Sequence, residues 1–210
     1  RDLAAEEPDR LGELQEAWEE AAWANQVFPL DEGANLVHLV RPPWEEDLEA
    51  AQTFYPGTPT VERYRASKLI NFRSFEVRVV LDHRDGHQGM LVAHGDQGGG
   101  YALYVEAGRL FHVHNGYGTM TEVDCGPMAD GTSEVVLAVE AAGDLVWNTV
   151  VRVDGAAVAE TRGLAVLMAM APFEGIDVGI DRRSPVSWSV YERPGPFPYT
   201  GTLHSVTYLP

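Results

Sequence analysis

Three aspartates are the side chains of this sequence best suited to bind a metal ion: Asp96, Asp177 and Asp181. Asp96 lies among small residues in His-Gly-Asp-Gln-Gly-Gly-Gly. Asp177 and Asp181 flank Val-Gly-Ile, which places both carboxylates on one face of a predicted strand. Calcium takes about six to eight oxygen ligands, so these three carboxylates are candidate ligands of a structural calcium ion, and no other cofactor is expected in this segment. The alternative is that Asp177 or Asp181 pairs with a nearby arginine: Arg182, Arg183 or Arg193.

Three histidines form a second candidate metal site. His112 and His114 are two residues apart on a predicted strand and therefore share a face of it, and His94 lies on a neighbouring predicted strand. Three imidazoles would leave one open position on a zinc ion. The alternative is an ordinary set of strand histidines on a polar face, because the sequence shows no carboxylate that would orient the rings.

Aromatic and cationic residues near the C-terminus could bind a ligand or dock on a partner: Arg182, Arg183, Trp188, Tyr191 and Tyr199. Prolines are frequent around them, which reduces the entropy lost when a loop becomes ordered. A flat aromatic surface beside polar side chains suits a sugar ring. The alternative is that the rings pack the loop onto the sandwich edge or onto another domain, because aromatic residues are enriched at interfaces. We predict a docking or ligand-binding loop over 181–199.

The elements that must position these residues begin with a helix over 8–24. Pro8 suits the first helical turn, and Leu11, Leu14, Trp18 and Ala22 follow at helical spacing along one stripe. A proline-rich connector over 33–58 follows, and its prolines argue against a central strand there.

From about residue 61 the hydrophobic period changes to two, which indicates strands. We predict strands over 75–81, 89–94, 101–106, 110–114, 134–141, 146–153, 156–161, 176–180 and 201–208. Asp154-Gly155 is a strong hairpin signal between two of them. The fold class predicted is mainly β: an antiparallel jelly-roll-like (concanavalin-like) β-sandwich preceded by one N-terminal α-helix. The domains predicted are 1–32 (the helix and an exit segment), 33–58 (the connector) and 59–210 (the sandwich).

The charge of the chain narrows the choice of partners. The 210 residues carry a formal net charge of −17, which disfavours nucleic acid and anionic membrane surfaces. The sequence contains no apolar run long enough for a membrane span and no visible signal peptide, and its single cysteine, Cys125, excludes an internal disulfide. These features do not indicate a cellular compartment.

Two stretches resemble the C-terminal region of bacterial arylsulfatases. Residues 2–31 read Asp-Leu-Ala, then Leu11 to Trp18, then Asn25-Gln-Val-Phe-Pro-Leu-Asp31, which is similar to the helix and exit segment that close a sulfatase core. Residues 171–185, from Ala-Pro-Phe-Glu-Gly-Ile-Asp to Arg-Arg-Ser-Pro, are similar to the C-terminal extension of those enzymes. The closing stretch 197–208 resembles the last strand of concanavalin-like and laminin-G-like jelly rolls.

The resemblance implies a non-catalytic C-terminal domain of an arylsulfatase-like sulfuric ester hydrolase. Its partner would be the catalytic domain of the same polypeptide, which would carry formylglycine and calcium. Sulfatases make formylglycine in a C/S-x-P-x-R motif, which neither Cys125-Gly-Pro-Met-Ala nor Ser184-Pro-Val-Ser matches. Glu174 to Asp177 also lacks the three-carboxylate spacing of a concanavalin-like glycosidase. No catalytic residue is therefore expected here. The alternative function is a stand-alone carbohydrate-binding β-sandwich module.

Overall fold

The chain divides into two units, Arg1–Arg41 and Pro42–Pro210, which are described separately. The computed structural model describes residues 2–25, 27–28, 50–168, 171–193 and 197–210. Most of the predicted exit segment and connector lies outside the described residues. In the part of the chain that the structure describes, no helix has the length and apolar character to cross a membrane.

The first unit contains helix α1 (Pro8–Ala24), as the sequence predicted. Pro8 occupies the first turn, where its missing N–H costs nothing, and the helix ends at Asn25, whose side chain donates to the carbonyl of Ala21 at 2.8 Å. Of the apolar stripe of α1, Ala22 is buried, whereas Leu14 is 54% and Trp18 is 59% exposed. The ring of Phe28 contacts the edge of Trp18, at 5.3 Å between centroids.

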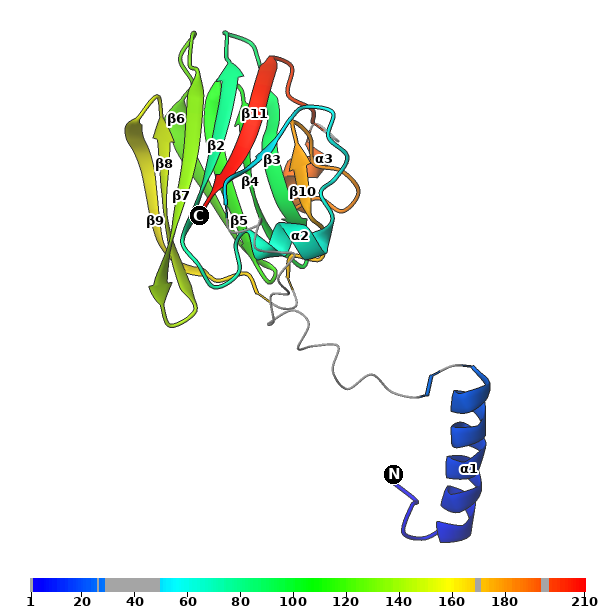
Figure 1. Ribbon diagram of the computed structural model, residues 1–210. Coiled ribbons are helices and arrows are strands. Elements are labelled where there is room, and N and C mark those ends of the chain that lie inside the picture. The colour runs from blue at the N-terminus through cyan, green and yellow to red at the C-terminus, as the bar shows by residue number, and fades with distance from the viewer. Residues whose placement is uncertain (1, 26, 29–49, 169–170, 194–196) are drawn as a thin grey trace. The chain divides into compact units, whose positions relative to one another are not determined.

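The second unit is a sandwich of two antiparallel sheets (Figure 1), which confirms the predicted fold class. The six-stranded sheet contains, in spatial order, β1 (Gln52–Phe54), β11 (Thr202–Leu209), β2 (Phe75–Asp82), β7 (Glu134–Gly143), β8 (Val146–Val153) and β9 (Ala156–Ala165). The five-stranded sheet contains β10 (Ile176–Val178), β3 (Gly89–Asp96), β4 (Gly99–Glu106), β5 (Arg109–Gly116) and β6 (Thr119–Pro127).

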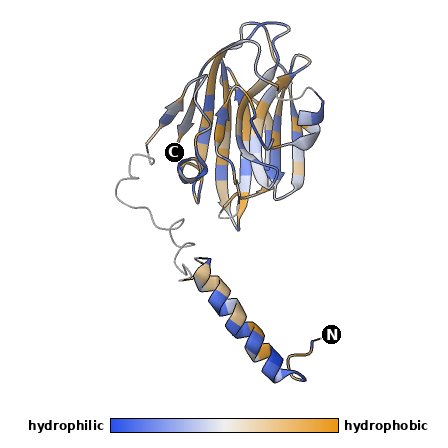
Figure 2. Ribbon diagram, turned by 90° about the vertical axis from the view of Figure 1, so that its right-hand side faces the viewer, coloured by the Kyte–Doolittle hydropathy of each residue, from blue (hydrophilic) through white to orange (hydrophobic). Residues whose placement is uncertain are grey.

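The core lies between the sheets and follows from the alternation of side chains. Along β2, Phe75, Val77, Val79 and Leu81 are buried while the residues between them are partly exposed. Figure 2 shows hydrophobic and hydrophilic residues following one another along the strands of the sandwich. Strands β3 and β4 differ, because they are buried on nearly every residue. Their outer face must therefore be covered as well.

The cover of that outer face is the segment around helix α3 (Trp188–Glu192). Val186 and Val190 form a second apolar cluster with the outward-facing residues of the five-stranded sheet, among them Ala102, Tyr104 and Val113. The loop predicted over 181–199 therefore contains a short helix that packs on the sheet. This arrangement positions the candidate site.

Three further elements depart from the sequence prediction. Strand β1 lies inside the predicted connector and pairs with β11, so the sandwich includes residues before position 59. It is an edge strand, which agrees with the nearby prolines. Strand β6 and the short helix α2 (Arg63–Lys68) were not predicted. β6 is a sheet edge with mostly exposed side chains, so its hydrophobic signal is weak.

Candidate functional site

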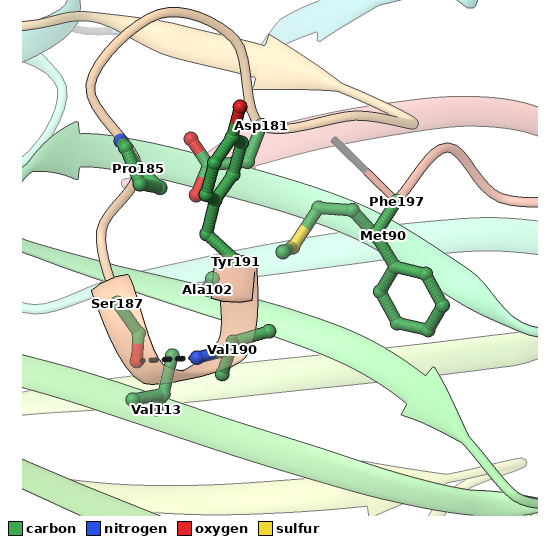
Figure 3. Close-up of a pocket in the computed structure, with 9 residues that line it drawn as sticks. All are labelled: Met90, Ala102, Val113, Asp181, Pro185, Ser187, Val190, Tyr191 and Phe197. Atoms are coloured by element: carbon green, nitrogen blue, oxygen red, sulfur yellow. Dashed lines mark hydrogen bonds between the residues drawn. The ribbon is translucent and has the colours of Figure 1, made fainter. Parts of the chain in front are cut away.

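Helix α3 is fixed on the sheet by its inner residues. Ser187 caps the helix, because its hydroxyl accepts a hydrogen bond from the backbone N–H of Val190 at 3.4 Å. Figure 3 shows Ser187 and Val190 of this segment beside Val113 of the sheet, and the same pocket is lined by Ala102, Asp181 and Tyr191. The cavity between them measures about 10 Å³, which is room for about one water molecule. The contact between α3 and the sheet therefore leaves almost no empty space.

Trp188 lies on the outward side of α3 and is half exposed, at 50%. Its indole N–H donates to Oε1 of Glu192 at 2.7 Å, and its ring stacks on Tyr191 with 5.2 Å between centroids and 24° between planes. Both partners belong to the same short helix. An aromatic ring that is exposed and yet held in place on two sides is an organised surface rather than a mobile one.

An open hollow of about 370 Å³ lies beside Trp188. Four parts of the chain line it: the turn between β3 and β4, the end of β5, the start of β6, and α3 with the residues before it. The lining residues are Gln97, Asn115, Gly118, Met120, Val186, Ser187, Trp188, Ser189 and Glu192. We call this place the Trp188 hollow. It combines one large aromatic ring with amide, hydroxyl and carboxylate groups.

Asn115 joins the walls of the Trp188 hollow. It is 2% exposed, and its side-chain NH₂ donates to the carbonyls of Gln97 at 2.9 Å, Val186 at 3.1 Å and Asp96 at 3.2 Å. Its side-chain oxygen accepts the N–H of Gly118 at 2.8 Å. One buried amide therefore connects the β3–β4 turn, the β5–β6 turn and the segment that leads into α3.

Asp96 holds another loop to the same edge of the sheet. Its Oδ1 accepts the N–H of Gly98 at 2.6 Å, and its Oδ2 accepts the N–H groups of Phe173 at 2.7 Å and Glu174 at 2.6 Å. Gly100 permits the approach of the α3 segment, because a Cβ there would lie 2.5 Å from the carbonyl oxygen of His94 and 3.0 Å from Val186. The glycine run 98–100 thus makes room for the packed loops.

The three predicted calcium ligands all bind groups of the protein itself. Asp177 pairs with the guanidinium of Arg182 at 2.8 Å and accepts the hydroxyl of Thr60 at 2.7 Å, which confirms the arginine alternative for this residue. Asp181 lies beyond the end of β10 and accepts the N–H of Val186 at 2.9 Å. Within the described ranges, no three carboxylate, imidazole or thiol side chains are arranged to share a metal ion. The calcium site stays a prediction.

The carboxyl group of Asp181 has an unusual pKa. Burial raises it to about 7, against the pull of the hydrogen bond from Val186, and the negative charges of Asp177, Glu174 and Asp96 raise it further. Burial also raises the pKa of Glu174, partly offset by a backbone hydrogen bond from Ser184 and by the guanidinium of Arg183. Acidic groups therefore crowd the loop that leads into α3.

The histidines do share a face, but it is the inner one. His94 and His114 are each paired in register with Tyr101, and all three histidines are buried among core residues. Burial lowers the pKa of His94 to about 3, that of His112, with the help of His114, to about 3, and that of His114 to about 4. His94 contacts the hydroxyl of Tyr101 at 3.1 Å. The prediction of an ordinary polar face was wrong, because this face meets the second sheet.

Of the five predicted ligand or docking residues, the structure brings two together, Trp188 and Tyr191. Arg182 is occupied by Asp177, and Arg183 is exposed on the loop before α3. The hydroxyl of Tyr199 lies 2.9 Å from Nδ1 of His83, and its ring packs on the core from another side.

Of the nine residues that line the hollow, the sequence analysis named only Trp188 as a candidate; Gln97, Asn115, Ser189 and Glu192 are among the polar ones that it missed. Only Glu192 left a readable signal, since it follows Trp188 by one helical turn.

Cys125 does not fit a formylglycine precursor. It is 5% exposed within the apolar core, where burial raises the pKa of its thiol to about 11. Its Sγ lies 3.6 Å from the carbonyl oxygen of Val123. Cys125 therefore behaves as a small buried apolar residue.

No protein-family model matches the chain, and no curated protein matches it. Solved structures resemble it in fold. The Ruminococcus gnavus IT-sialidase CBM40 bound to α2,3-sialyllactose is 12% identical with a TM-score of 0.50, over 76% of this chain and 89% of that one. The Caenorhabditis elegans galectin LEC-6 is 12% identical with a TM-score of 0.41, over 75% of this chain and 94% of that one. At such identities a likeness concerns the fold alone, and the Ruminococcus gnavus module agrees with the jelly-roll-like β-sandwich described above.

Proposed function

We propose that the sandwich is a carbohydrate-binding module and that the Trp188 hollow is its glycan site. The observation that carries this proposal is the half-exposed indole of Trp188, held by Glu192 and Tyr191 at the hollow. A pyranose ring presents an apolar face of C–H groups, which packs on an aromatic ring, and a rim of hydroxyl groups that need hydrogen-bond partners. Trp188 supplies the aromatic ring for the C–H face, and Gln97, Ser189 and Glu192 supply hydrogen-bond partners for the hydroxyl groups.

The rigidity of the site supports the same proposal. A ligand gains more from a surface that is already organised, because less side-chain freedom is lost on binding. The indole is fixed from both sides, and Asn115 ties together the turns that form the walls. The fold also supports it, since the Ruminococcus gnavus module of similar fold is bound to a sialylated sugar.

Removal of the aromatic surface tests the proposal. The purified chain is applied to a glycan array, and hits are titrated by calorimetry. Trp188→Ala should weaken binding at least about tenfold, because the stacking surface is lost. The matched control is Trp23→Ala, which removes another exposed tryptophan, 58% exposed, from the helical unit and should leave affinity unchanged. Binding that survives Trp188→Ala, or a wild-type chain that binds no glycan, would contradict the proposal.

The arylsulfatase setting stays a second proposal. Its support is the resemblance of residues 2–31 and 171–185, together with the exposed stripe of Leu11, Leu14 and Trp18 on α1, which could face another domain. In that setting the catalytic domain of the same polypeptide is the partner and holds the formylglycine and the calcium. A C-x-P-x-R or S-x-P-x-R motif in the reading frame upstream of residue 1 would support it, and a frame without one would contradict it.

A further inference from the structure

We infer that the Trp188 hollow selects uncharged glycans and rejects sialylated or sulfated ones. This inference rests on the proposed function and names the class of ligand. Its starting point is the charge of the lining. Among the nine described residues that line the hollow, Glu192 is the single charged side chain, and it is a carboxylate.

The carboxylate of Glu192 is fixed beside the place where a sugar stacked on Trp188 would lie. Its Oε1 accepts the N–H of Trp188 at 2.7 Å, so the negative charge stays beside the indole ring. A carboxylate accepts hydrogen bonds from sugar hydroxyls and repels a carboxylate or sulfate on the ligand. Within a site of about 370 Å³, such a group on the ligand would lie well inside the Debye length of about 8 Å at physiological ionic strength.

The cations nearest along the chain are already engaged with acidic groups. Arg193, next to Glu192, lies 3.0 Å from a carboxylate oxygen of Glu106 and 3.9 Å from one of Glu122, and it also donates to the hydroxyl of Tyr104 at 3.2 Å.

Neither of the two arginines before α3 lines the hollow. Arg182 is paired with Asp177 at 2.8 Å, and Arg183 is exposed on the loop, where its charge acts on the carboxyl of Glu174. An anionic sugar in the hollow therefore meets no cation among the nine lining residues. The net charge of −17 adds a long-range repulsion of the same sign.

The test compares glycans that differ only in charge. Neutral oligosaccharides are printed beside their sialylated and sulfated forms, lactose beside α2,3-sialyllactose among them, and affinities are measured at low and high salt. The wild type should prefer each neutral parent about five- to tenfold, and the preference should shrink as salt rises.

Glu192→Gln is the informative variant, because glutamine keeps an oxygen for the Trp188 N–H and loses the charge. It should narrow the preference about fivefold, read as the ratio of the affinities for the neutral and the anionic form, so that any change common to both forms cancels. Glu140→Gln, on the exposed part of β7, removes the same charge away from the hollow and should leave this ratio unchanged. Anionic forms bound as well as neutral ones, with binding still lost in Trp188→Ala, would overturn this inference alone. A chain that binds no glycan would overturn the proposed function with it.

Discussion

The indole N–H of Trp188 lies 2.7 Å from Oε1 of Glu192, one turn further along a helix of five residues. This hydrogen bond gives the exposed ring a fixed direction from within the helix itself. The helix takes its own direction from Val186 and Val190, which are buried on the outer face of the five-stranded sheet. The site therefore depends on a local hydrogen bond within α3 and on the packing of α3 against the sheet, and each can be tested separately.

Asn115→Ala should destabilise the sandwich and weaken glycan binding together. The substitution removes the donor shared by three carbonyl groups and the acceptor of the Gly118 N–H. An unsatisfied buried polar group costs about 1–3 kcal/mol, so the free energy of unfolding should fall by at least that amount. Urea denaturation measures it. Asn148→Ala, at a more exposed amide on β8, is the control and should change stability by only about 0.5 kcal/mol.

The buried histidines should make the sandwich labile to acid. Their pKa values are lowered to about 3 for His94 and His112 and about 4 for His114, so the folded state resists protonation that the unfolded state accepts below pH 6.5. The stability that each contributes is complete above pH 6.5 and is lost as pH falls toward 3–4, at about 1.4 kcal/mol per pH unit.

His112→Leu tests this prediction through the slope of stability against pH. Urea midpoints between pH 7.5 and 5 should fall less steeply in the variant, because one of the three groups no longer takes up a proton on unfolding. A change in packing alone would shift the curve by the same amount at every pH. Parallel curves for wild type and variant would therefore contradict the assignment.

Asp181 should affect the pH dependence of stability in the opposite direction to the histidines, and Asp181→Asn tests this. Burial, with the charges of Asp177, Glu174 and Asp96, raises the pKa of this carboxyl from 3.8 to about 7, so the folded state binds a proton that the unfolded state has lost. The stability that this proton contributes is complete below pH 3.8 and is lost as pH rises toward 7.

The amide of the variant stays neutral and can still accept the N–H of Val186. Asp181→Asn should therefore gain stability over the wild type with rising pH, by about 1.4 kcal/mol per unit up to about pH 7, and the gain should level off above it. Melting curves at pH 4.5, 6 and 8 measure the difference. A difference that is equal at all three would mean that Asp181 is ionised throughout.

Cys125 should react slowly with thiol reagents while the protein is folded. Its side chain is buried, and burial raises the pKa of the thiol to about 11. Reagents therefore reach the thiol poorly, and little of it is ionised to the reactive thiolate. With a disulfide reagent at pH 8, we expect a rate at least about 100-fold below that of the urea-unfolded chain. Because the sequence contains one cysteine, the signal has a single source, and Cys125→Ala supplies the blank. Equal rates would place the thiol at the surface.

The sequence by itself determined helix α1 and most of the long strands. The helix begins at Pro8 and these strands lie where alternating side chains and Gly or Asp turns predicted them, because these patterns depend on neighbours within a few residues. The short edge strand β1 and the exposed edge strand β6 were not predicted, because few of their side chains are buried and the hydrophobic pattern is correspondingly weak.

Tertiary structure alone decided which faces are inside and which distant residues meet. The alternation showed that His112 and His114 share a face, but only the second sheet made that face the core. Trp188 and Tyr191 were two of the five predicted ligand or docking residues, and their contact is local to one helix. Gln97, Asn115 and Ser189 meet beside them because strand register and the seat of α3 bring together segments about 70–90 residues apart, and long-range packing of this kind leaves no local pattern to read.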